Sequence, residues 1–435
     1  MNQEQKFLGK ICGSRSARWL ATLLFCSLTV CGWLALYELN RQESLFSKLG
    51  EHPPHLFIDD FTQFYAMGQL VGSDRRDKLY DPRTQDEFLN RILSPRHTTK
   101  IFFAQNVPWL FCVMVPFTAF PLATAYLFWN VLQVLCAALG LALICRDVRK
   151  MTTLSTALLI AGATACQPAW LNFERGNTAW FVVAFLCIYT WALIRQRDLP
   201  GGIALALSAQ KPQYAILAAI PALTFRRWRL IGYAAGTELI LWLMAGFQVG
   251  FPNILGYPSM LLQADANTNY DGHDPLQHVN LRAFLIAHLS HSVGMTAGVV
   301  IFVVGVVALG LLWLRVGKVD GELFRWTMAL TLTSAVVISP HACVYDITLL
   351  SIPAALTLVP GSDQEPAVAR VCFWLWTALL ASFPLTSWGL YLMENLDSRF
   401  QHEPLAMINA GLLVVCLAAY YFVSKRSPAE ERPAA

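Results

Sequence analysis

Five short groups of polar residues interrupt an otherwise apolar chain, and their side chains are of types that bind anions and move protons. The groups centre on Asp59-Asp60, Arg175, Lys211, His341 and Asn280. A carboxylate can accept a proton from an alcohol, whereas arginine, lysine and histidine can bind a phosphate. Together, these residue types would suit a site that holds a phosphate-linked molecule and deprotonates a hydroxyl group.

The paired aspartates lie in the apolar stretch 56–61 and are followed by the aromatic residue Tyr65. Burial of a carboxyl group in apolar surroundings raises its pKa towards neutrality, which suits a general base. The alternative is that the aspartates cap the helix that follows them. Both interpretations hold if one aspartate is the base and the other is the cap. The sequence leaves open whether Asp59 or Asp60 is the base.

Arg175 stands in the group Glu174-Arg175-Gly176-Asn177, between two apolar segments. An arginine next to a glycine and a helix N-terminus can hold a phosphate, and Asn177 lies within the same group. The alternative is a simple ion pair between Glu174 and Arg175 at the protein surface.

Lys211 precedes Pro212 at a break between two short apolar segments, near residues 201–211 and 212–225. A single lysine deep in an apolar hairpin needs a partner, and the phosphate of an anionic lipid would serve. The alternative is that the long side chain simply extends towards water.

His341 ends the stretch 339–341, and Tyr345 follows it at the boundary of another apolar segment. A histidine can donate to a phosphate oxygen or transfer a proton, although one at a helix end is often satisfied locally. Asn280 belongs to the polar stretch 278–282, which precedes a short apolar helix. The alternative there is ordinary loop polarity at the start of an amphipathic segment.

The elements that must position these residues are those of a membrane protein. Of the 435 residues, 56% are hydrophobic and only 14% are charged, and the mean hydropathy is +0.46. Soluble domains carry about 25% charged residues. The chain is therefore expected to be an all-α polytopic membrane protein with one domain over 1–427 and a disordered tail at 428–435. About twelve segments could span a bilayer: 18–38, 120–145, 152–168, 178–194, 201–211, 212–225, 229–250, 293–316, 323–339, 345–360, 367–390 and 405–423.

The distribution of lysine and arginine predicts the orientation of these spans. With both termini in the cytoplasm, the positive-inside rule is met by every basic turn. The same rule favours a helical hairpin over a single span at 201–225. The long segments 39–119 and 251–292 then face the exterior, together with all five polar groups. The basic turns are 146–150, 195–197, 226–229, 315–318 and 425–426.

A short amphipathic helix is expected within the first external segment. Thr84 and Glu87 have the spacing of a capping box, which marks the start of a helix. The apolar residues Phe88, Leu89, Ile92 and Leu93 follow on one face. This pattern is typical of a helix that lies on the membrane surface.

Several other classes of site are not expected from the sequence. Most of the 11 cysteines lie in apolar runs, where cysteine acts as a small hydrophobic residue, and no Cys/His group has the spacing of a zinc site. No glycine-rich phosphate loop or nucleotide-sugar motif is present, so we expect neither a metal nor a cofactor. The net charge of +4 without a long basic run excludes a nucleic-acid partner.

The order of five short motifs resembles the bacterial DUF2029-type glycosyltransferases. This family includes the polyprenol-phosphate-mannose-dependent mannosyltransferases of phosphatidylinositol mannoside synthesis. The resemblance covers about residues 18–425, almost the whole chain. Its motifs are Asp60 to Tyr65, Leu79 to Pro82, Arg175 to Asn177, Lys211-Pro212 and Ser339 to His341.

The resemblance implies a GT-C fold of about 12 transmembrane helices, with amphipathic juxtamembrane helices in the first external loop. It implies transfer of a hexose, above all mannose, from a polyprenyl-phosphate sugar donor to a lipid or glycan acceptor, with inversion. The reaction would take place at the outer face of the bacterial cytoplasmic membrane, among membrane lipids. The family's catalytic aspartate falls on Asp60, with Asp59 as the neighbouring possibility, and its donor contacts fall on Lys211 and His341.

Two other functions are compatible with the same residues. A transporter or lipid flippase would use the broken helix and the charged residues within the membrane as a substrate path, although no inverted repeat is visible. A polymerase or ligase of a lipid-linked oligosaccharide would share the chemistry of transfer and differ in the size of its donor.

Overall fold

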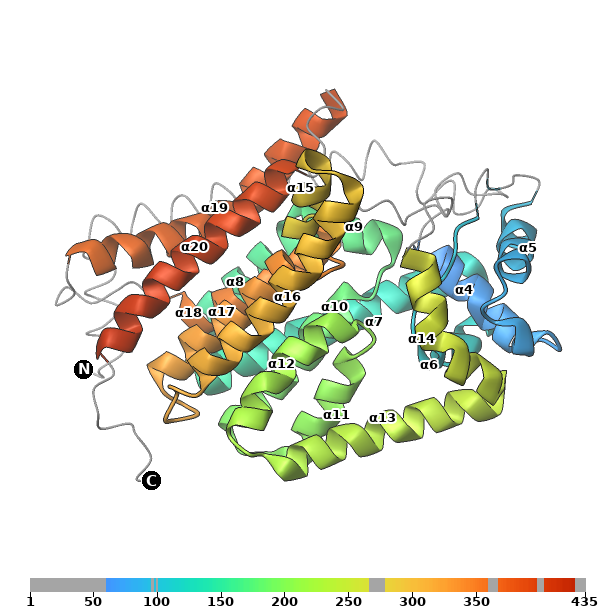
Figure 1. Cartoon of the computed structure of the whole chain (residues 1–435), viewed down its shortest axis with the longest axis horizontal. Coiled ribbons are helices and arrows are strands. Elements are labelled where there is room, and N and C mark those ends of the chain that lie inside the picture. Colours follow the sequence, from blue (N-terminus) through green and yellow to red (C-terminus); the bar gives the residue numbers. More distant parts are fainter. Residues whose placement is uncertain are drawn as a thin grey trace.

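The computed structural model describes residues 60–94, 98, 101–265, 278–358, 367–396 and 403–426, and all regular structure within these residues is helical (Figure 1). The predicted first span at 18–38, the predicted tail at 428–435 and Asp59 lie outside the described residues. The all-α prediction is confirmed for the described part of the chain.

Five helices are long and apolar enough to cross a bilayer, and a sixth span is possible if the bent pair α8 (Thr153–Ala165) and α9 (Gln167–Arg175) crosses as one. This pair bends by 63° at its break. The chain is thus a multi-pass membrane protein, but the count of twelve spans is not confirmed. The five segments are Leu122–Val148, Trp228–Val249, His291–Trp313, Val371–Leu392 and Pro404–Lys425.

Several predicted spans are shorter helices that are buried inside the bundle. Helix α17 (Glu322–Ile338) has 17 residues, and 15 of them are buried. Helix α10 (Ala179–Ile194) has 16 residues. Composition alone could not separate such helices from complete spans, because an interior helix is apolar on every side whether or not it crosses the bilayer.

The expected helical hairpin at 201–225 is present as α11 (Asp198–Ser208) and α12 (Pro212–Thr224). Pro212 occupies the first position of α12, where its missing N–H group costs nothing. The proline also keeps the preceding residue out of the helical region, and Lys211 has φ −121° and ψ 85°. The dipeptide Lys211-Pro212 therefore breaks the hairpin locally.

The remaining helical elements complete the bundle (Figure 1). They are α4 (Asp60–Val71), η1 (Arg76–Lys78), α5 (Pro82–Leu93), α6 (Pro108–Met114), η2 (Val115–Ala119), α7 (Leu122–Ala142), η3 (Leu143–Val148), α13 (Trp228–Val249), α14 (Phe251–Asp265), α15 (Leu281–His288), α16 (His291–Trp313), η5 (Val344–Leu350), α18 (Ser351–Thr357), α19 (Ala367–Leu396) and α20 (Glu403–Arg426).

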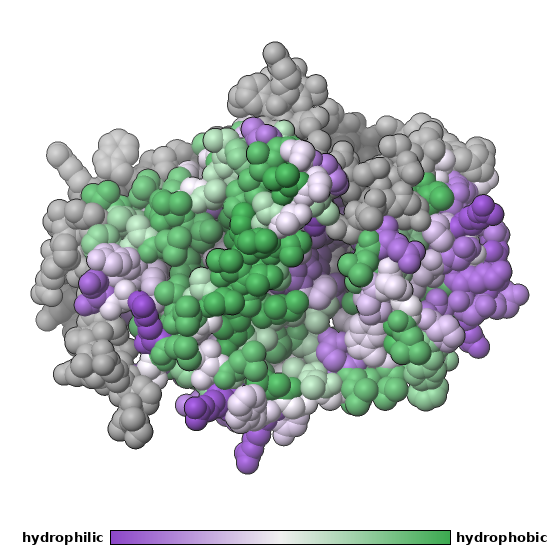
Figure 2. Space-filling view, viewed as in Figure 1, coloured by the Kyte–Doolittle hydropathy of each residue, from purple (hydrophilic) through white to green (hydrophobic). Residues whose placement is uncertain are grey.

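The outer surface of α16 is apolar along its length. Val299, Val303, Val304 and Val307 are each more than half exposed. Figure 2 shows apolar residues covering the middle of this face of the molecule, whereas the largest group of polar residues lies at its right-hand side. Such a strip would be unfavourable in water and is expected of a helix that contacts lipid.

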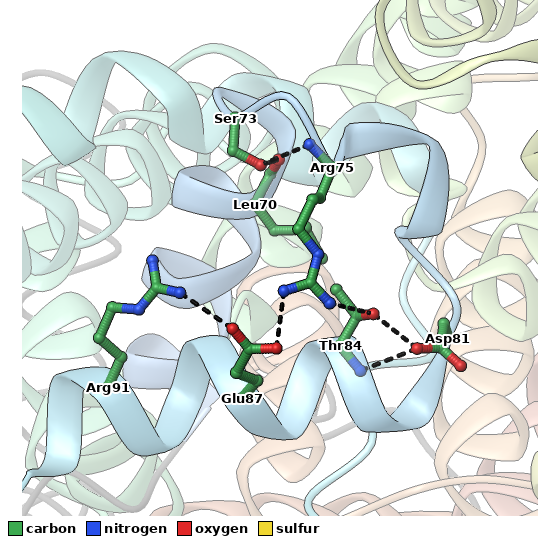
Figure 3. A network of polar contacts seen from close by, with 7 residues as sticks. All are labelled: Leu70, Ser73, Arg75, Asp81, Thr84, Glu87 and Arg91. Atoms are coloured by element: carbon green, nitrogen blue, oxygen red, sulfur yellow. Dashed lines mark hydrogen bonds and ion pairs between the residues drawn. The ribbon is translucent and has the colours of Figure 1, made fainter.

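Helix α5 begins at Pro82, two residues before the predicted capping box. Asp81 is the N-cap, and its carboxylate accepts a hydrogen bond from the backbone N–H of Thr84 at 2.9 Å. Glu87 instead accepts hydrogen bonds from Arg75 at 2.6 Å and from Arg91 at 3.1 Å (Figure 3). The capping-box prediction is wrong because Asp-Pro gives the stronger start signal.

The apolar face of α5 is buried within the protein. Phe88, Leu89 and Leu93 are at most 4% exposed and belong to the same hydrophobic cluster as residues of α4 and α6. The predicted amphipathic helix is therefore present, but its position does not confirm the expected contact with the membrane surface. The same amphipathic pattern serves either packing partner, so the sequence could not distinguish them.

Candidate functional site

Asp60 is the first residue of α4 and lies against the Arg-Gly-Asn group. Its Oδ2 atom accepts a hydrogen bond from Asn177 Nδ2 at 2.9 Å, although the two residues are 117 positions apart. The structure thus brings together two of the five polar groups expected to form a site. Asp59 lies outside the described residues, so the choice between the two aspartates stays a prediction.

Gly176 allows this close approach. It caps α9 with φ 63° and ψ 30°, a left-handed conformation that glycine adopts without steric cost. A Cβ atom on Gly176 would lie 2.5 Å from the Cβ atom of Phe61, and the indole N–H of Trp129 donates to the Gly176 carbonyl at 2.8 Å. The glycine of this motif therefore positions Phe61, and with it Asp60, beside Asn177.

The surroundings of Asp60 act on its acidity in opposite directions. Burial raises the pKa of Asp60 above the ordinary aspartate value, because burial disfavours the charged form. The positive charge of Arg175, the hydrogen bond from Asn177 and the positive charge of Lys211 each lower the same pKa. Burial is the largest of these effects, so Asp60 is a stronger base than an exposed aspartate.

Lys211 is buried, with 8% of its surface exposed, and forms an ion pair with the fully buried Asp346. Its ammonium group also lies 4.6 Å from the centre of the Tyr345 ring. The interpretation of Lys211 as a cation without a protein partner is therefore wrong. The sequence gives no sign of this partner, because Asp346 is 135 residues away from Lys211.

Hydrogen bonds hold the segment around His341 against this ion pair. Gln213 Nε2 donates to the carbonyl of His341 at 2.9 Å, which joins the start of α12 to residues 339–343. The second carboxylate oxygen of Asp346 accepts from the backbone N–H of Cys343 at 3.0 Å. His341 therefore lies close to the Lys211–Asp346 pair in the fold.

Asn280 and Tyr65 have contacts that serve the fold. The Asn280 side chain caps α15 by accepting from the backbone N–H of Ala283 at 2.8 Å. The Tyr65 hydroxyl donates to the carbonyl of Phe120 at 2.8 Å and so ties α4 to the end of η2. The cap explains the position of the Asn280 side-chain oxygen without a substrate, and substrate contacts by either residue stay predictions.

The model of glycosyltransferase family 87 matches residues 106–340, more than half of the chain. The chain belongs to glycosyltransferase family 87. This match confirms the resemblance to membrane glycosyltransferases of the GT-C type. It includes the Arg-Gly-Asn group and Lys211-Pro212, and it ends one residue before His341. A search of curated proteins found no match.

Membership in glycosyltransferase family 87 favours sugar transfer over transport. In this family 87 chain, the partly buried carboxyl group of Asp60 lies within electrostatic range of two cations, Arg175 and Lys211. One further group, formed by His278, His341 and Cys343, places two nitrogen ligands and one sulfur ligand within reach of one another. Their sequence positions gave no sign of this, because His278 is far from the other two along the chain.

Proposed function

We propose that the chain transfers a hexose, with mannose as the first candidate, from a polyprenyl-phosphate donor to a hydroxyl group of a lipid or glycan acceptor. Asp60 is the general base in this proposal. The observation that carries it is the hydrogen bond that holds the partly buried Asp60 against Asn177, within electrostatic range of Arg175 and Lys211.

The reaction is a single displacement at the anomeric carbon. The carboxylate of Asp60 takes the proton of the acceptor hydroxyl group as its oxygen forms the new glycosidic bond. The bond between the anomeric carbon and the phosphate oxygen breaks, and its electron pair leaves with the lipid phosphate. Attack from the face opposite the leaving group inverts the anomeric carbon.

Lys211 and Arg175 stabilise the departing phosphate, and His341 contacts it. An ammonium group has three N–H donors, and the ion pair with Asp346 occupies one side of it. Asp346 therefore orients Lys211 while leaving donors for a phosphate oxygen. Fixed cations aimed at a developing negative charge are among the strongest contributions to catalysis.

An apolar cavity of about 320 Å³ supports a lipid-linked donor. Residues of α8, η5, α18 and α19 line it, among them Ile347, the residue after Asp346. Leu158, Leu159 and Phe383 are other apolar residues of its walls. A polyprenyl chain could bury its apolar groups there while its phosphate stays near Lys211. The polar groups of a nucleotide would find few partners in such an apolar cavity.

The test is transfer by the purified full-length protein in detergent, with a panel of polyprenyl-phosphate sugars and release of free polyprenyl phosphate as the readout. We expect release with a lipid-linked hexose and none with nucleotide sugars. Transfer from a nucleotide sugar, with no transfer from any lipid-linked donor, would overturn the proposal.

The proposed site faces the outside of the bacterial cytoplasmic membrane, with both termini in the cytoplasm. Asp74 and Arg197 are exposed residues that this orientation places on opposite sides. In intact cells, a cysteine introduced by Asp74→Cys should react with an impermeant thiol reagent, and one introduced by Arg197→Cys should react only after lysis. The reverse pattern would contradict the proposed orientation.

A further inference from the structure

We propose that His278, His341 and Cys343 bind one zinc ion. One nitrogen of each histidine and the sulfur of Cys343 all lie within 4.8 Å of one another. The two imidazole rings meet edge to face, with centroids 4.1 Å apart. Donors around a tetrahedral zinc are separated by roughly 3.5 Å, so small side-chain rotations suffice to close the three ligands on an ion.

The backbone around these ligands is held by contacts from several elements. The N–H of Val279 donates to the carbonyl of Ala342 at 2.8 Å, which fixes the residue after His278 to the residue after His341. Gln213 holds the His341 carbonyl at 2.9 Å. Metal affinity depends on such outer contacts, because they set the position of the ligands before the ion arrives.

The ligand set indicates which metal is bound. Two imidazoles and one thiol suit zinc, whereas magnesium and calcium require oxygen ligands. His278 is buried, and His341 and Cys343 are partly exposed, so an ion could reach the group from one side. Three protein ligands leave a fourth position for water or another oxygen ligand, as in zinc sites that take part in catalysis.

Zinc binding must displace the proton of Cys343. A bound cation favours the thiolate, and the proton passes to solvent as the Zn–S bond forms. The nearby charge of Lys211 opposes the ion, but its ion pair with Asp346 offsets that charge.

The position of the group connects it with the proposed transfer, and this part of the inference rests on the proposed function. The backbone N–H of Cys343 donates to Asp346, which is also the partner of Lys211. A phosphate held by Lys211 would therefore lie near the open position of the zinc ion. In that case His341 acts on the donor phosphate through the ion rather than directly.

The test is titration of the full-length, chelator-treated protein in detergent with Co²⁺, whose spectrum reports its ligands. We expect about one equivalent to bind with the intense visible bands of tetrahedral Co²⁺ and a thiolate charge-transfer band. Zn²⁺ should displace the Co²⁺. Cys343→Ser should remove the charge-transfer band, and His278→Ala or His341→Ala should weaken binding by at least about tenfold.

Matched controls lie outside the group. Cys136→Ser and His291→Ala remove a cysteine and a histidine elsewhere in the described chain, and both should leave the titration unchanged. If wild-type protein binds no more Co²⁺ than the Cys343→Ser variant, or if the charge-transfer band survives that substitution, the zinc site is overturned.

The titration needs no sugar donor, so its failure leaves the proposed transferase function standing. Conversely, a protein that binds Co²⁺ at this site but transfers no sugar from any lipid-linked donor would refute the proposed function and retain the zinc site.

Discussion

The two ends of the helical bundle hold their charged residues in different ways. Asn177 precedes α10 and Arg195 follows it, so these two residues are separated by 16 helical residues, about 24 Å along the axis. At the Arg195 end, Arg195 pairs with Asp147 at 2.7 Å, and both side chains are more than a third exposed. At the other end, the side chains of Lys211 and Asp346, taken without their backbone atoms, are 10% and 0% exposed.

This difference indicates where function is to be expected. An exposed ion pair forms with little loss of hydration and contributes about 0–1 kcal/mol. A buried pair loses the hydration of both charges, and its attraction only roughly offsets that cost. The Arg195 end therefore needs no explanation beyond contact with water and lipid head groups. The buried charges of Lys211 and Asp346, together with the partly buried carboxyl group of Asp60, suggest a site that uses them.

The largest effect is expected from Asp60→Asn. The amide keeps the size of the side chain but cannot accept a proton, so transfer should fall by about 10²–10⁴-fold with little change in thermal stability. Rates of polyprenyl phosphate release measure this loss. Asp147→Asn at the other end is the control and should leave the rate unchanged.

Asp59→Asn tests which of the two aspartates is the general base. It should cost only a local hydrogen bond if Asp60 is the base. If Asp59→Asn abolishes transfer and Asp60→Asn does not, the roles are exchanged. If neither substitution lowers the rate, both residues act as caps and the proposed base is refuted.

Lys211→Met should weaken donor binding by about 10- to 100-fold, since a charged hydrogen bond contributes about 1.5–3 kcal/mol. It should also destabilise the protein by about 3–5 kcal/mol, because Asp346 keeps a buried charge without its partner. Donor titration and thermal unfolding measure the two effects separately. Arg195→Met should alter stability by no more than about 1 kcal/mol.

A double variant separates the two roles of Lys211. Lys211→Met with Asp346→Leu removes both buried charges and should recover most of the lost stability. Donor binding should stay weak in this variant. Recovery of donor binding together with stability would show that Lys211 serves the fold alone.

Gly176→Ala tests how the site is assembled. Its left-handed conformation costs alanine about 1–2 kcal/mol, and the added Cβ atom would meet Phe61 at 2.5 Å. The variant should unfold at a lower temperature and transfer sugar more slowly, because Phe61 and Asp60 must move. Gly232→Ala in the interior of α13 is the control, since no atom beyond its chain neighbours and its own helix backbone lies within 4 Å of the added Cβ. Transfer should stay at the wild-type rate, and the unfolding temperature should not fall, because alanine favours a helix more than glycine does.

The smallest effect is a shift in pH dependence. Asp60 acts as a carboxylate, so transfer should fall as the pH decreases through its raised pKa, which lies above the ordinary value of 3.8. The positive charge of Arg175 lowers this pKa, so Arg175→Gln should move the acidic limb to higher pH. Arg195→Gln should leave the limb in place. An identical profile in the Arg175→Gln variant would contradict the proposed coupling.

The sequence by itself determined the class of the protein and much of its local structure. Apolar composition is sufficient to predict a helical membrane protein, because a chain in lipid must satisfy its backbone hydrogen bonds internally. The break at Lys211-Pro212 was also predictable, since proline restricts the residue before it. The number of spans was not, because an apolar run does not show whether it faces lipid or the inside of the bundle.

Only the tertiary structure decided which polar residues meet. Asp60 contacts Asn177 across 117 residues, and Lys211 pairs with Asp346 across 135. The sequence contained all four residues, but local spacing carries no information on contacts between distant helices. The meeting of His278 with His341 was equally hidden. Such contacts depend on how helices pack against one another, and that packing is set by the fit of the whole core rather than by any one segment.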